Sequence, residues 1–145
     1  MKHILSLSFI LIVCFFASAP CELYAQSKTT VVDINTISYK DGIVTMYVNI
    51  PTKTKKPKMP KVAMSIKDDV IYKIVYAGIE RTPYNQAMQL DNQISFKELR
   101  DLIGDDISVR ELYYDNKVVN AKCTFDIKYI ERKLMDRGIV KKFGL

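Results

Sequence analysis

The chain has 145 residues, a formal net charge of +6, and 48% hydrophobic and 26% charged side chains. A chain of this length and composition is expected to form one domain around one hydrophobic core. Neither G-x-G-x-x-G nor G-x-x-x-x-G-K-[ST] occurs in the sequence, which excludes nucleotide sites of those two types.

Residues 1–25 are predicted to be a secretory signal peptide. A short basic start precedes the apolar run Ile4–Phe16, and small residues follow the run, which is the layout of such a leader. We expect cleavage after Ala25, because an earlier cut would leave Pro20 as the first residue. A retained membrane anchor is the alternative, but the apolar run is shorter than the roughly 20 residues of a spanning helix.

Cys21 raises a second alternative, a lipoprotein that is acylated on this thiol. The preceding residue is Pro20 and the residue three before is Ser18, whereas the acylation signal has a small residue and usually a leucine at these places. We therefore expect residues 26–145 to be the mature chain, a single exported domain in the periplasm or outside the cell.

The mature chain has few residues that could carry chemistry. Cleavage removes the only histidine, His3, and leaves Cys123 as the only cysteine. This excludes Ser-His and Cys-His catalytic pairs, histidine-ligated metal sites and a disulfide framework. No N-x-S/T sequon occurs, which favours a bacterial envelope or extracellular protein. We expect no catalytic residues, no cofactor and no bound metal.

Two strands are predicted at the start of the mature chain. Val31–Tyr39 is β-like, and residues 44–50 alternate between apolar and polar side chains after the turn Lys40–Gly42. Alternation after an Asp-Gly turn predicts a β-hairpin. Pro51 has no amide donor and is expected to end the second strand. The lysine- and proline-rich stretch 51–61 follows as a connection.

A second hairpin is predicted from Val62–Ile66 and Val70–Ala77, with its turn at Lys67–Asp69. The reason is that every second residue from Val70 onward is a large aliphatic or aromatic one. Residues 78–92 are predicted to form either a short helix beginning near Pro83 or an ordered loop.

A helix is predicted after Ser95, because Ser95 and Glu98 form the S-x-x-E capping box. Gly104 is expected to end this helix in the left-handed conformation. Ile107–Tyr114 and Val118–Phe125 are then predicted to form a third hairpin.

A last helix is predicted between Asp126, as its N-terminal cap, and Gly138. Ile127, Ile130 and Leu134 form its apolar stripe. The chain is therefore expected to have an α+β fold, a mostly antiparallel sheet of about three hairpins with two short helices packed on one face.

Two pairs of acidic residues, Asp68-Asp69 and Asp105-Asp106, could bind calcium or act as paired carboxylates. Neither pair lies in a D-x-[DN]-x-[DN]-G loop. Aspartate is common in turns, so we interpret both pairs as turn residues.

Tyrosine and lysine recur four residues apart at Tyr113 and Lys117 and at Tyr129 and Lys133. A tyrosine–lysine acid–base pair acts with a dinucleotide, whose glycine fingerprint is absent here. Cys123 alternates with apolar residues, so we expect a buried and inert thiol.

Positive charge is concentrated in the stretch 51–61 and in the last part of the chain, from Lys128 onward. Outside the inner membrane the anionic partners are lipid headgroups, acidic glycans and acidic protein faces, so we expect no nucleic-acid partner. The predicted contacts with an anionic surface are Lys53, Lys55, Lys56, Lys58, Lys61, Arg132, Lys133, Lys141 and Lys142.

The sequence favours a small, exported, non-catalytic binding or assembly module. Its basic segments are expected to contact an envelope protein, an acidic glycan or an anionic lipid surface, with no membrane-spanning segment in the mature chain. The alternative is a small exported hydrolase or inhibitor-like module that works through carboxylates. The stretch 51–61 has its own simpler interpretation as a solvated loop.

Overall fold

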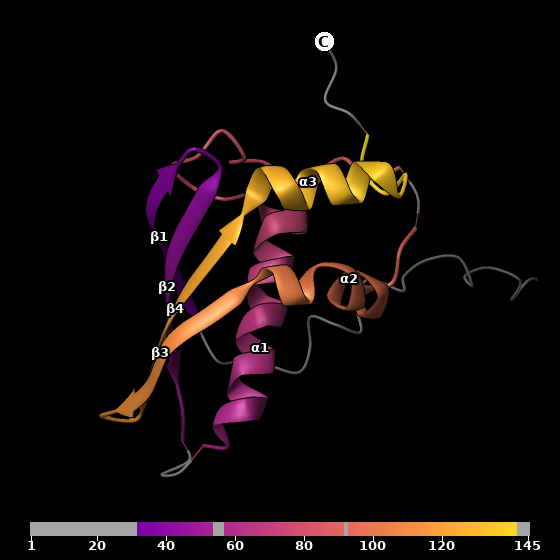
Figure 1. Ribbon diagram of the computed structural model, residues 1–145. Helices are drawn as coiled ribbons and strands as arrows, with labels where there is room; N and C mark the ends of the chain where they lie inside the picture. Colours follow the sequence, from indigo (N-terminus) through magenta and orange to yellow (C-terminus); the bar gives the residue numbers. More distant parts are fainter. Residues whose placement is uncertain (1–31, 54–56, 92, 142–145) are drawn as a thin grey trace, which may run out of the picture.

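The computed structural model describes residues 32–53, 57–91 and 93–141. In this part of the chain, three α-helices cover one face of a four-stranded antiparallel sheet with strand order β1-β2-β4-β3 (Figure 1). The α+β prediction is thereby confirmed, while the predicted leader, residues 1–25, lies outside the described residues. The elements are β1 Asp33–Lys40, β2 Ile43–Pro51, α1 Met59–Tyr72, η2 Lys73–Ala77, α2 Phe96–Ile103, η3 Gly104–Asp106, β3 Ser108–Asp115, β4 Val118–Asp126 and α3 Ile127–Asp136.

The first and third predicted hairpins are confirmed, and both have two-residue turns. Asp41 and Gly42 join β1 to β2 with φ values of 56° and 98°, and Asn116 and Lys117 join β3 to β4 with 47° and 64°. Positive φ at both central residues is the signature of a type I′ turn, whose twist matches that of the flanking strands. Local turn chemistry therefore fixes both hairpins.

The two hairpins join through β2 and β4, the central strands. Their register runs from Ile43 opposite Asp126 to Pro51 opposite Val118, so β2 ends at the proline, as its missing amide donor predicts. Alternate residues of both strands point into the core: Val44, Met46, Val48, Val119, Ala121, Cys123 and Phe125.

The second predicted hairpin is wrong, because residues 59–77 form α1 and the π-helical turn η2. Val70 and Ile74 lie in the core, but Tyr72 and Tyr76 between and after them are exposed. Residues four apart share a face in a helix and also in a strand. The spacing of Val70 and Ile74 therefore fits a helix as well as a strand. Tyr72 and Tyr76 made the segment look like an alternating strand.

The new helix also changes the interpretation of its flanking residues. Pro60 stands in the first turn of α1, where a proline loses no hydrogen bond because that amide has no partner within the helix. The end of the stretch 51–61 is therefore helical rather than a connection. Asp68 and Asp69, predicted in a turn, lie within α1.

The helix predicted after Ser95 is confirmed as α2, with its capping box formed in both directions. Its predicted end is wrong in detail, because Gly104 has φ −62° and begins the 3₁₀ turn η3 instead of adopting the left-handed conformation. Asp105 and Asp106 therefore lie in η3, so the chain enters β3 without a glycine cap.

The last predicted helix is confirmed as α3. The Asp126 side chain accepts a hydrogen bond from the amide of Tyr129, and Gly138 beyond the helix has φ 66°. Residues 78–91 form an ordered loop, one of the two alternatives predicted for them, and Leu90 makes an isolated bridge to Val140.

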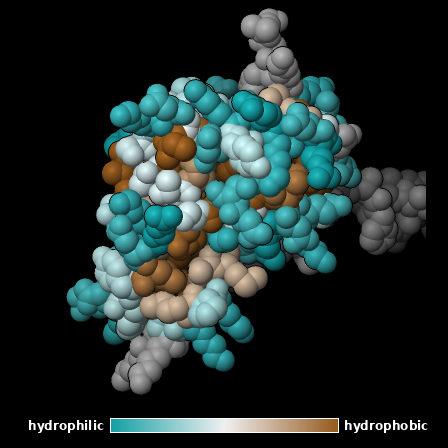
Figure 2. Space-filling view, in the orientation of Figure 1, coloured by the Kyte–Doolittle hydropathy of each residue, from teal (hydrophilic) through white to brown (hydrophobic). Residues whose placement is uncertain are grey.

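The core lies between the sheet and the helices. Ile66 and Ile71 of α1, Leu99 of α2 and Ile130 of α3 all have no exposed surface. In the view of Figure 2, hydrophilic residues cover most of the surface over α3, while hydrophobic ones gather over the sheet. The described part of the chain is therefore stabilised by one continuous apolar core, as its size predicts.

Candidate functional site

Three chain segments that carry exposed lysines lie at the end of the molecule where α1 begins (Figure 1). Lys53 follows β2, Lys58 and Lys61 flank the start of α1, and Lys117 lies in the β3–β4 turn. A hydrogen bond of 2.7 Å from the Thr52 amide to the Lys117 carbonyl joins two of these segments. We call these four lysines the basic end.

The lysines of the basic end are exposed, and none forms an ion pair with another described residue. Lys58 is the N-terminal cap of α1, makes no capping hydrogen bond with its side chain, and is followed by no acidic residue in the first turn. The N-terminus of a helix carries a partial positive charge. The basic end therefore adds lysines to a helix end that already favours anions.

The other predicted contact residues lie elsewhere. Arg132 and Lys133 are in α3, which lies beyond the opposite end of α1 (Figure 1). Lys133 donates to Asp106 at 2.7 Å, and Lys141 pairs with Asp91 at 3.1 Å. Three of the predicted residues fall outside the described part of the chain: Lys55, Lys56 and Lys142. The structure thus divides the predicted contacts into two separate groups.

Lys117 was not among the predicted contacts. It is a turn residue 56 positions beyond Lys61 in the chain, and only the pairing of β2 with β4 brings its hairpin to the start of α1. No local sequence pattern predicts that pairing, so the sequence around Lys117 could not have identified it as part of this site.

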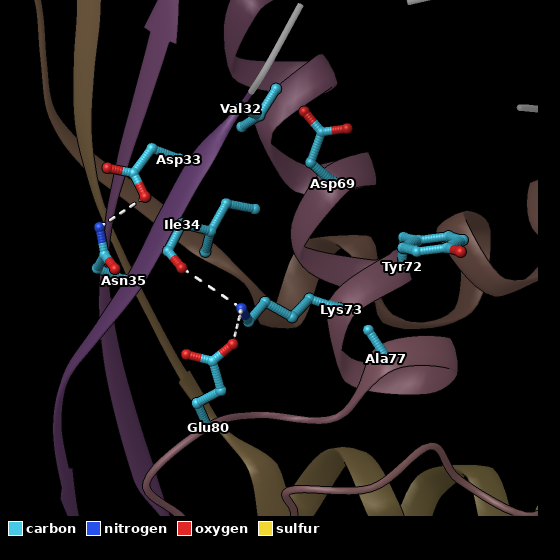
Figure 3. A pocket seen from close by; sticks show the side chains of 9 residues that line it. All are labelled: Val32, Asp33, Ile34, Asn35, Asp69, Tyr72, Lys73, Ala77 and Glu80. Carbon is cyan, nitrogen blue, oxygen red and sulfur yellow. Dashed lines mark hydrogen bonds and ion pairs between the residues drawn. The ribbon is translucent and has the colours of Figure 1, made fainter. Parts of the chain in front are cut away.

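A cavity of about 410 Å³ lies between the outer strand β1 and the helical segment α1–η2 (Figure 3). We call it the β1 groove. Its lining residues are Val32, Asp33, Ile34, Asn35, Asp69, Tyr72, Lys73, Ala77 and Glu80.

Lys73 crosses the β1 groove from the helix side to the strand. Its ammonium group lies 3.4 Å from the Ile34 carbonyl oxygen and 3.5 Å from a carboxylate oxygen of Glu80, both long contacts (Figure 3). At the strand side, the side-chain amide of Asn35 donates a hydrogen bond to the Asp33 carboxylate at 2.7 Å. Three carboxylates and one ammonium group therefore line this groove.

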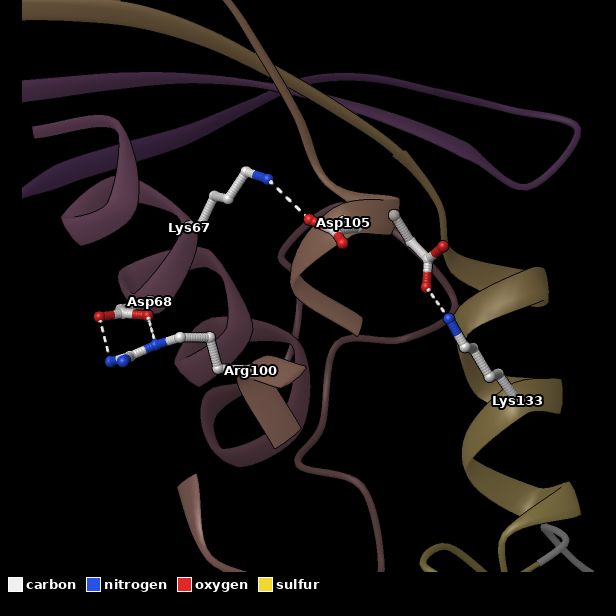
Figure 4. A network of polar contacts seen from close by, with 6 residues as sticks. Lys67, Asp68, Arg100, Asp105 and Lys133 are labelled. Carbon is white, nitrogen blue, oxygen red and sulfur yellow. Dashed lines mark hydrogen bonds and ion pairs between the residues drawn. The ribbon is translucent and has the colours of Figure 1, made fainter. Parts of the chain in front are cut away.

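The remaining acidic residues of the two aspartate pairs bind the helices to one another (Figure 4). Arg100 of α2 donates twice to Asp68 of α1, with both contacts at 2.6 Å. Lys133 of α3 holds Asp106 of η3, and Lys67 of α1 lies 3.7 Å from Asp105. These aspartates therefore link the helices to one another. They do so from helical positions and not from the turns that the sequence had predicted.

Cys123 and the pair Tyr129 and Lys133, which were considered for thiol and acid–base chemistry, make packing contacts in the structure, and the pKa of a further group, Tyr84, is also shifted by its surroundings. Cys123 is fully buried in β4, and burial raises the pKa of its thiol to about 12. The Lys133 ammonium group lies 5.7 Å from the Tyr129 ring centroid, a cation–π distance. Burial, followed by the charge of Glu131 and the hydrogen bond to it, raises the pKa of Tyr84 to about 12.

The chain matches no protein-family model, no curated protein and no solved structure. Within the described ranges, no group of histidine, cysteine and acidic residues is arranged to hold a metal ion. None of the described helices is both long enough and apolar enough to cross a membrane.

Proposed function

We propose that this chain is an exported, non-catalytic binding module that docks through its basic end on an anionic surface outside the inner membrane. The proposal rests above all on one observation: four exposed lysines, without ion-pair partners among the described residues, belong to three segments at the end of the molecule where α1 begins. The sequence of residues 1–25 supports export.

The physical argument is the electrostatic cost of this arrangement. A positive side chain near a helix N-terminus is unfavourable, by roughly 0.3–1 kcal/mol for each charge at low salt. The α1 N-terminus has Lys58 and Lys61 beside it and no acidic residue in its first turn. An anion at this end would interact favourably with the lysines and with the free amides of the first helical turn.

A layer of anionic lipid headgroups is the partner that fits best. The three segments that carry these lysines lie at one end of the molecule (Figure 1), an arrangement that suits contact with an extended surface. Each lysine near an anionic membrane contributes about 1 kcal/mol to binding. Four would give about 4 kcal/mol, close to a thousandfold in affinity.

The test compares two variants with the same loss of charge. One replaces Lys53, Lys58, Lys61 and Lys117 by serine, and the control replaces the exposed residues Lys40, Lys97, Lys128 and Arg132 by serine. Both are measured by co-sedimentation with vesicles containing phosphatidylglycerol, across a range of salt concentrations. Heparin forms a parallel arm that distinguishes a glycan partner from a lipid surface.

We expect the basic-end variant to lose at least a hundredfold in vesicle affinity and most of the salt dependence, while the control loses little. Equal losses in the two variants would mean that net charge alone drives binding, and the proposal would fail. Binding to heparin but not to vesicles would replace the lipid surface with an acidic glycan. Thermal melts of both variants establish that each is folded.

A further inference from the structure

The β1 groove runs along a free edge of the sheet. In the strand order β1-β2-β4-β3, β1 has only one neighbour among the described strands. An outer strand presents unpaired amides and carbonyls on its free side, to which an added strand can bind. The contact from Lys73 to the Ile34 carbonyl shows that this carbonyl points away from β2. In an antiparallel strand the amide of the same residue points the same way.

The wall opposite this edge is helical and contains apolar surface. Tyr72 and Ala77 line the groove on the helix side, and Val32 and Ile34 line it on the strand side. Lys73 and Ala77 are the first and last residues of the π-helical turn η2. Turns of this type are rare in proteins overall but are often found at functional sites. An extended segment could therefore pair with β1 while its side chains contact the helix.

The charge of the β1 groove is opposite to that of the whole chain. Asp33, Asp69 and Glu80 line it together with the single ammonium group of Lys73, although the protein carries a net charge of +6. Glu80 is paired with Lys73, and the exposed Asp33 of β1 adds negative charge at the strand side. The complementary occupant carries a positive side chain.

We propose that the β1 groove binds an extended, lysine- or arginine-bearing segment of a partner protein, which adds to the edge of β1 beside Val32–Asn35. The incoming amide takes the place of Lys73 at the Ile34 carbonyl, where the present contact of 3.4 Å is long. The positive side chain of the added strand lies beside Asp33, which points away from α1 on the outer side of β1 (Figure 3). Such strand addition takes affinity from backbone hydrogen bonds and specificity from the side-chain pockets.

The other free edge is less suited to an added strand. β3 is interrupted in its middle, between Arg110 and Tyr113, where Glu111 has φ 50°. A bulge of this kind twists an edge away from a partner. The irregularity of β1 lies later, between Thr36 and Ser38, and leaves the groove segment of the edge unbroken. This limits the paired segment to about four residues.

The experiment uses the full chain, expressed with its own leader, and the probe peptide acetyl-Thr-Val-Lys-Val-Thr-amide. Binding is followed by amide chemical shifts in NMR. We expect saturable shifts at residues 32–36 and 73–80, and at least tenfold weaker binding when the central lysine of the probe is replaced by glutamate. Saturable shifts confined to β3 or to the basic end would overturn the proposal, as would equal affinity for both peptides.

Two further comparisons separate strand addition from simple charge attraction. Each of two peptides is N-methylated on one set of alternate amides, and only one is expected to lose binding, because an added strand pairs through one edge. Retention by both would refute strand addition. In the protein, Asp33→Asn should weaken binding of the lysine peptide at least fivefold, whereas the exposed control Asp101→Asn should not.

Discussion

Gly78 and Gly138 provide a matched test of the loop that follows α1 and η2. Both have positive φ, 87° and 66°. A Cβ atom at Gly78 would lie 2.5 Å from the backbone carbon of Asn85 and 2.6 Å from its carbonyl oxygen, whereas one at Gly138 would meet nothing within 4 Å. Replacement by alanine therefore strains the backbone at both positions but creates a clash at Gly78 alone.

The two substitutions should differ clearly in the free energy of unfolding. Gly138→Ala should cost about 1 kcal/mol, the price of a left-handed alanine. Gly78 has φ 87° and ψ 162°, a region almost restricted to glycine, which costs about 1–3 kcal/mol. The overlap with Asn85 adds an overpacking cost of about 1–3 kcal/mol, because the Ile79 amide binds the Tyr84 carbonyl at 2.6 Å and holds this loop. For Gly78→Ala we expect about 2–6 kcal/mol in total.

Urea unfolding followed by circular dichroism measures both variants against the parent chain, with the slope of the transition checked for a common value. Similar slopes license a direct comparison of midpoints as stabilities. If Gly78→Ala costs no more than Gly138→Ala, the close approach of Asn85 to the end of η2 is wrong. The placement of Glu80 in the β1 groove would then lose its support, since this loop carries it.

Three further tests concern the helices and the core. Ser95→Ala removes the hydroxyl that accepts a hydrogen bond from the Glu98 backbone amide at 3.2 Å. It should lower the free energy of unfolding by about 1 kcal/mol. An unchanged urea midpoint would mean that this cap does not stabilise α2. A double-mutant cycle with Asp68→Asn and Arg100→Met should give a coupling of about 1 kcal/mol, and zero coupling would contradict the two 2.6 Å contacts. Burial raises the pKa of Cys123 from 9.0 to about 12, so its thiol should resist iodoacetamide at pH 8 until urea unfolds the chain. Since the unfolded state loses this proton first, stability should fall between pH 9 and pH 12, by up to about 1.4 kcal/mol per pH unit, and Cys123→Ala should remove that part of the decline.

Short-range signals predicted the elements that short-range chemistry determines. The Asp41-Gly42 turn and the Ser95–Glu98 capping box each lie within a few residues, and both formed as predicted. The helix α1 was missed because Val70 and Ile74 fit either a strand or a helix. The signal that could have decided is Pro60, which is favoured in the first turn of a helix.

The candidate sites depended on that helix more than on any motif. Asp69 and Lys73 lie one helical turn apart and about 6 Å along α1, whereas in a strand they would be about 13 Å apart. Asp69 and Lys73 therefore both line the groove because residues 59–77 are helical. Lys117 joined the basic end only through the β2–β4 pairing, which is a long-range contact.

The two proposed surfaces lie along the same helix and carry opposite charge. On α1, Lys61 of the basic end and Asp69 of the β1 groove are eight residues apart, which is about 12 Å along the helix axis. This distance exceeds the Debye length of about 8 Å at physiological salt, so neither surface neutralises the other. A single domain could therefore rest on an anionic layer while its groove holds a basic segment of a partner. Loss of the basic end should then leave peptide binding intact, whereas loss of α1 should abolish both.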